Sequence, residues 1–194
     1  MPHSTFQYNT RHASMEKLVR TIDSATWYSG HVIAWLLLAM VLLESAVVLL
    51  RYGFDIGSIA LQESVTYLHA AAFLLGAAYT LQSDEHVRVD IFYRHFNARQ
   101  KAWVNLLGFI FLLLPVCTFI IWESGVYVAQ AWRVREVSAD SGGLNGVYLL
   151  KTLIPLFATL LIVQGLAEAL RAWLALQGRT VLPPPELDHR DAAL

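Results

Sequence analysis

The sequence predicts an all-α integral membrane protein with four transmembrane helices and one interfacial helix between the second and the third. Hydrophobic residues make up 56% of the 194-residue chain and charged residues only 15%, against roughly a quarter charged in an ordinary soluble domain. Four almost uncharged runs are each long enough to cross a bilayer core of about 30 Å. Because no alternating pattern suggests a barrel, these runs are expected to be helices.

The four runs define a membrane domain over residues 25–174. The segments before and after it, 1–24 and 175–194, are expected to be tails, the second of them disordered. None of the remaining segments is long enough to bury a core of its own, so no soluble catalytic or ligand-binding domain is expected. The predicted spans are 25–50, 64–83, 102–122 and 146–173.

An amphipathic helix is predicted over residues 84–101, between the second and third spans. Four apolar residues recur there at the spacing of one helix face: Val89, Phe92, Tyr93 and Phe96. Such a helix lies flat on a leaflet with its basic residues among anionic headgroups. The headgroup candidates are Arg94, Arg99 and Lys101. The alternative is an irregular loop with scattered charges.

The basic residues predict which side of the membrane each loop occupies, because cytoplasmic loops carry an excess of Lys and Arg. Most of them lie before the first span, between the second and third, and after the fourth. The two outer loops hold only Arg51, Arg133 and Arg135. Both termini and the middle loop are therefore expected in the cytoplasm. The residues that favour this orientation are Arg11, Lys17, Arg20, Arg88, Arg94, Arg99, Lys101, Arg171, Arg179 and Arg190.

Two charged residues within spans are candidates for an intramembrane ion pair. Glu44 lies ~9 Å from the outer end of the first span and Lys151 ~6 Å from the outer end of the fourth, at 1.5 Å per helical residue. Since the two depths match, Glu44 and Lys151 could pair. The alternative is that each side chain reaches water or a partner subunit separately.

The depths of residues within the spans also argue against two alternative functions. A haem- or quinone-associated anchor subunit of an oxidoreductase would need paired histidines at one depth, whereas His31 and His69 differ by ~13 Å in height. A small proton-coupled exporter would use Glu44, which lies near the outer edge rather than the middle of its span. Neither rival is favoured.

Composition excludes further classes. The 14 basic and 15 acidic residues nearly cancel, so no nucleic-acid partner is expected. The single cysteine, Cys117, excludes an internal disulfide and a multi-cysteine metal site. Pairs of small residues four apart instead predict close packing between helices. These pairs are Ala72 and Gly76, Gly125 and Ala129, and Gly165 and Ala169.

Two stretches around the second span carry a family resemblance. Leu75 to Leu81, followed by His86 to Tyr93, resembles the signature of the small membrane subunit of TRAP (tripartite ATP-independent periplasmic) transporters, the DctQ-like family. Further matching features are Arg51-Tyr52, Glu63-Ser64, Glu136-Val137-Ser138 and Gln164-Gly165. The resemblance covers about residues 20–175.

The resemblance implies a subunit of the bacterial inner membrane that is a scaffold and not an enzyme. Its partners would be a large, DctM-like elevator subunit and a periplasmic binding protein, in sodium-coupled uptake of a small organic acid or related solute. No cofactor is implied for this chain, because sodium is expected on the large subunit. The candidates for partner interfaces are Glu63, His86, Arg88, Asp90, Glu136 and Ser138.

Overall fold

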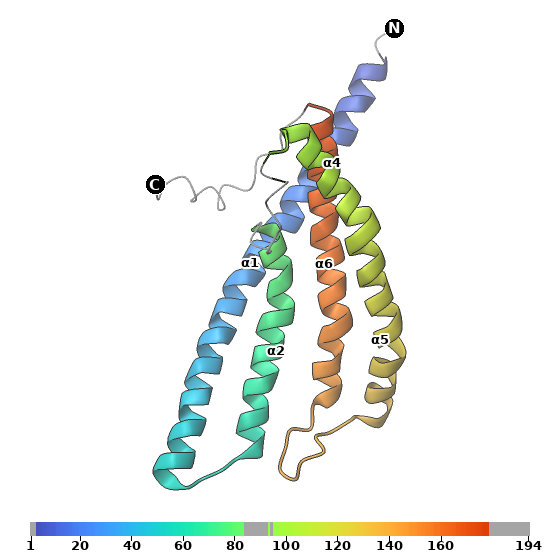
Figure 1. Ribbon diagram of the computed structural model, residues 1–194. Helices are drawn as coiled ribbons and strands as arrows, with labels where there is room; N and C mark the ends of the chain where they lie inside the picture. Colours follow the sequence, from blue (N-terminus) through green and yellow to red (C-terminus); the bar gives the residue numbers. More distant parts are fainter. Residues whose placement is uncertain (1–2, 84–92, 94, 179–194) are drawn as a thin grey trace, which may run out of the picture.

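The computed structural model describes residues 3–83, 93 and 95–178, with side chains from Ser14 onward. Over these residues the chain is an antiparallel bundle of long helices without a β-strand (Figure 1). Four helical stretches are long and apolar enough to cross a membrane, which confirms the predicted fold class. The elements are α1 (His3–Phe54), α2 (Ile59–Gln82), α4 (Ala98–Gly108), η1 (Phe109–Leu113), α5 (Leu114–Val134) and α6 (Val147–Leu176).

The helices extend beyond the uncharged runs that predicted them. Helix α1 begins at His3, so most of the expected N-terminal tail is helical. An uncharged run marks what can lie in hydrocarbon, whereas a helix ends where caps or turn residues end it. The third span illustrates this, because Asn97 and Gln100 form a reciprocal capping box that starts α4 at Ala98.

This cap changes the end of the expected interfacial helix over residues 84–101. Residues 98–101 are the first turn of α4, at the start of the third span, rather than the end of a separate helix. Tyr93 is helical, but Asn97 has an extended backbone conformation. Residues 84–92 and 94, where most of that prediction falls, lie outside the described residues.

Helix α6 is the centre of the bundle. It contacts α1, α2, α4, η1 and α5, and Figure 1 shows it between α2 and α5. Its buried positions are mostly small, so neighbouring backbones approach closely. They are Ala158, Gln164, Gly165, Ala167, Ala169, Ala172 and Leu174.

A π-helical turn, η1, interrupts the third span next to Pro115. Proline has no N–H to donate and its ring collides with the carbonyl four residues earlier, which a wider turn relieves. The turn places Phe109 and Leu113 against Gly165 of α6. A Cβ atom added to Gly165 would lie 2.9 Å from Cδ2 of Phe109 and 3.1 Å from Cδ2 of Leu113.

Two of the three small-residue pairs pack inside the chain. Ala72 is buried, and a Cβ on Gly76 would be 3.7 Å from the side chain of Ile33, where α1 and α2 meet. Gly165 and Ala169 pack in the centre of the bundle. Gly125 and Ala129 are exposed on α5, and a Cβ on Gly125 would meet nothing within 4 Å. This third pair is therefore free for another helix.

Candidate functional site

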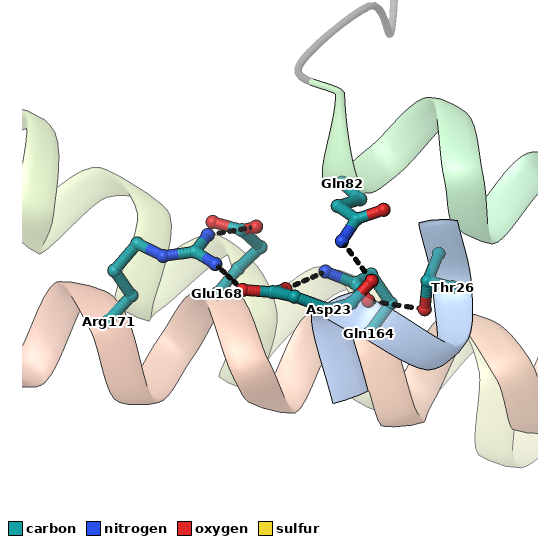
Figure 2. A network of polar contacts seen from close by, with 6 residues as sticks. All are labelled: Asp23, Thr26, Gln82, Gln164, Glu168 and Arg171. Atoms are coloured by element: carbon teal, nitrogen blue, oxygen red, sulfur yellow. Dashed lines mark hydrogen bonds and ion pairs between the residues drawn. The ribbon is translucent and has the colours of Figure 1, made fainter. Parts of the chain in front are cut away.

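A polar network, the Asp23 network, joins α1, α2 and α6 at one end of the bundle. This end is called the Asp23 end. Figure 2 shows its six residues: Asp23 and Thr26 of α1, Gln82 of α2, and Gln164, Glu168 and Arg171 of α6. The Asp23 carboxylate accepts hydrogen bonds from Arg171 Nη2 at 2.5 Å and from Gln164 Nε2 at 3.1 Å. Arg171 also pairs with Glu168.

The amide side chains complete the Asp23 network. Gln82 Nε2 donates to the backbone oxygen of Asp23 at 2.6 Å, which ties the end of α2 to α1. Thr26 donates its hydroxyl to Gln164 Oε1 at 2.8 Å. Gln164 thus accepts from Thr26 and donates to Asp23, and it is fully buried. The network therefore holds α1, α2 and α6 in one register.

Burial makes this network sensitive to the loss of any member. The Asp23 side chain is 1% exposed, against 25% for Arg171 and 27% for Glu168. A carboxylate removed from water is stable only when paired and hydrogen-bonded, because its desolvation is otherwise uncompensated. Arg171 and Gln164 supply that compensation from α6. Asp23 therefore makes the packing of α1 on α6 depend on specific partners.

Asp23 is not among the functional residues that the sequence predicts. It lies two residues before the uncharged run that begins at Ala25, in the predicted N-terminal tail. Arg171 was counted only as a cytoplasmic charge. A signal was nevertheless present in Gln82 and Gln164, because a glutamine within an apolar helix is costly unless another helix satisfies it.

A second polar cluster, called here the Glu63 clamp, holds the loop between α5 and α6 onto α2 at the opposite end. Glu63 accepts hydrogen bonds from the Ser138 hydroxyl and from the backbone N–H of Leu144, the latter at 2.6 Å. Gly143 leaves room for this contact, since a Cβ there would lie 2.7 Å from Glu63 Oε1. Glu63 and Ser138, predicted as partner-interface residues, thus bind each other within the chain.

Lys151 pairs with Glu136 and not with Glu44. Its Nζ is 2.6 and 2.7 Å from the two carboxylate oxygens of Glu136, and it lies 4.0 Å from the ring centroid of Tyr127. Glu44 is exposed on α1, and Figure 1 shows α2 between α1 and α6 at this end. The predicted ion pair was wrong in its partner, because matching depth does not determine which helices are neighbours.

A double-mutant cycle tests this assignment. Glu136→Gln and Lys151→Met should each lower thermal stability in detergent, and the double variant should lose less than the sum of the two single losses. The reason is that either single change leaves a partly buried charge without its partner. The matched cycle of Lys151→Met with Glu44→Gln should be additive. Coupling to Glu44 and not to Glu136 would overturn the structural pairing.

The remaining predicted residues are placed as follows. His86, Arg88, Asp90 and Arg94 lie outside the described residues. Arg99 is exposed in the first turn of α4, and Lys101 lies 5.2 Å from the ring centroid of Tyr93. Their role at lipid headgroups stays a prediction, as does the role of Glu63, Glu136 and Ser138 at a partner interface.

The two intramembrane histidines face a shared groove between α1 and α2. His31 Nδ1 is 3.1 Å from the backbone oxygen of Trp27, and His69 stacks on Phe73 with ring centroids 6.3 Å apart. In the described part of the chain no group of three or more His, Cys, Asp or Glu residues is placed to hold a metal ion.

Comparison with known proteins gives one family. The family model described as "Tripartite ATP-independent periplasmic transporters, DctQ component" matches residues 40–175. That range contains the Glu63 clamp and four members of the Asp23 network, but begins after Asp23 and Thr26. No curated protein and no solved structure matches significantly.

Proposed function

This chain belongs to the DctQ component family of TRAP transporters, and from that premise we propose that it is the fixed membrane scaffold of such a transporter. The large membrane subunit would carry the substrate and sodium sites and move against it. A periplasmic binding protein would deliver a small organic acid or related solute. The Asp23 end would face the cytoplasm and the Glu63 clamp the periplasm of the bacterial inner membrane. The family match is the observation that carries this proposal.

Two features of the bundle, its polar clusters and an exposed apolar surface, support a role as a scaffold. A body against which another subunit slides must keep its own helices in register, and the two polar clusters hold the bundle at both ends. It must also offer an apolar surface inside the membrane. Helix α5 does so with exposed Phe119, Trp122 and Val126 around Gly125.

Reconstitution tests the scaffold role. The chain should copurify one-to-one with a larger membrane subunit, and proteoliposomes should take up solute only when both subunits and the binding protein are present. Full transport by the large subunit and binding protein alone would refute an essential role. A strong Soret band in the purified complex would instead favour the haem-bearing anchor.

A substitution on α5 tests where the large subunit docks. Gly125→Leu should reduce copurification with the large subunit, because the added side chain keeps another helix from approaching closely. The fold should survive, since a Cβ at Gly125 meets nothing within 4 Å. Gly53→Leu, at an equally open glycine near the end of α1, is the matched control and should copurify normally. Equal copurification of the two variants would exclude this face of α5 as the interface.

A further inference from the structure

A groove of about 730 Å³ runs between α1 and α2 on the side of the bundle. This volume is in the range of about 300–1,000 Å³ that is typical of small-molecule sites. Its lining is mainly apolar and includes several small residues. Ala34, Gly76 and Ala77 contribute little side-chain volume along it, while Leu37 and Phe73 form part of its walls.

The length of the groove identifies the kind of occupant. On α1 its lining extends from Gly30 to Leu37, ~10 Å, and on α2 from His69 to Thr80, which is ~16 Å at 1.5 Å per residue. That equals one leaflet of a hydrocarbon core about 30 Å thick. A lipid acyl chain occupies one leaflet only and therefore fits a groove of this length, whereas a partner helix that crosses the bilayer would extend beyond it. Since Thr80 lies near the Asp23 end, the leaflet is the one on that side.

Two polar atoms of the groove are engaged within the chain. The Thr80 hydroxyl donates to the backbone oxygen of Gly76 at 2.9 Å. His31 Nδ1 lies 3.1 Å from the backbone oxygen of Trp27. Neither of these two atoms requires a polar ligand, and most of the lining is apolar, so the groove suits a hydrocarbon chain.

The helix that forms one wall of the groove also carries positive charge at its mouth. Arg20, Trp27 and His31 are spaced by seven and four residues, so they follow one face of α1 from the membrane surface into the groove. Arg20 and the nearby Lys17 are exposed, and neither forms an ion pair with a described residue. Trp27 lies between them and the groove along α1, and tryptophan is enriched at membrane interfaces.

We propose that the groove between α1 and α2 binds an acyl chain of an anionic phospholipid from the leaflet at the Asp23 end, with Lys17 and Arg20 attracting the headgroup. The chain passes Trp27 and the Tyr79 ring, which covers Gly30, and lies against Ala34 and Gly76. The lipid fills the space that the small residues leave between the two helices.

Photo-crosslinking of the full-length chain tests the lipid site. The chain is reconstituted in vesicles of phosphatidylcholine with phosphatidylglycerol that carries a diazirine on one acyl chain. Adducts, mapped by mass spectrometry, should concentrate on residues 30–37 and 69–80. Ala34→Phe should remove most of them because its ring occupies the groove. Ala39→Phe, an equal change at an exposed position of α1 outside the groove, should leave them unchanged.

The headgroup part of the proposal has its own measurement. Arg20→Gln should lower the groove adducts of the phosphatidylglycerol probe about fivefold, the effect of one basic residue at an anionic surface. Adducts of a matched phosphatidylcholine probe should not change. Equal loss for the two probes would overturn the role of Arg20.

Two results would overturn the site itself. One is adducts spread evenly around α1, with Ala34→Phe no different from Ala39→Phe. The other is loss of the groove adducts on assembly with the large subunit, accompanied by protein crosslinks from a photoreactive residue at Ala34. That result would assign the groove to a partner helix.

Discussion

Asp23→Ala is expected to destabilise the bundle by removing polar contacts that tie α1 to α6 at the Asp23 end. The substitution leaves Arg171 without its partner on α1 and Gln164 Nε2 without an acceptor. A buried donor left without its acceptor typically costs about 1–3 kcal/mol, while Arg171 keeps its contact with Glu168. The variant should therefore unfold at a clearly lower temperature in detergent and give less folded protein in membranes.

Conservative variants separate charge from packing in this prediction. Asp23→Asn keeps the size of the side chain but loses the charge, so it should also be destabilised, though less than Asp23→Ala. Glu44→Gln makes the same chemical change at an exposed residue and should have little effect. If Asp23→Asn and Glu44→Gln have equal melting temperatures, the Asp23 network does not hold α1 onto α6.

Gly165→Leu should prevent α6 from packing on the π-helical turn. Even a single Cβ at this position would lie within 3.1 Å of both Phe109 and Leu113, so a leucine must separate the helices. Overpacking of this kind typically costs about 1–3 kcal/mol. The expected result is a low yield of folded chain and loss of protease resistance in the loop between α5 and α6.

Two alanine variants should change the stability of the bundle in opposite directions. Alanine has a higher helix propensity than glycine by about 1 kcal/mol, so Gly125→Ala, in open space, should be neutral or stabilising. Gly165→Ala should be destabilising despite the same gain. Combining Gly165→Ala with Phe109→Leu should recover part of the loss. A stabilising Gly165→Ala would contradict the close approach of α6 and η1.

Residue types alone identify some members of the Asp23 network but not the contacts between them. Gln164 was part of a recognisable motif, and Glu168 and Arg171 were visible as charges near the end of a span. Their common partner was not identified, because Asp23 is 141 residues from Gln164 along the chain. Pairings between distant helices depend on which faces meet, and a single sequence does not contain that information.

The pattern of residues was sufficient to predict the four-span helical class and the family, because the length and apolarity of a run and a local motif are properties of contiguous residues. The tertiary structure was needed to identify the partners of individual side chains. It assigned Lys151 to Glu136 where equal depth had suggested Glu44, and it engaged Glu63 in holding a loop. It also showed that Gly165 is packed and Gly125 open, although both are small residues in apolar helices. The reason is that depth and periodicity describe one helix at a time, whereas a contact requires two helices to present the right faces to each other.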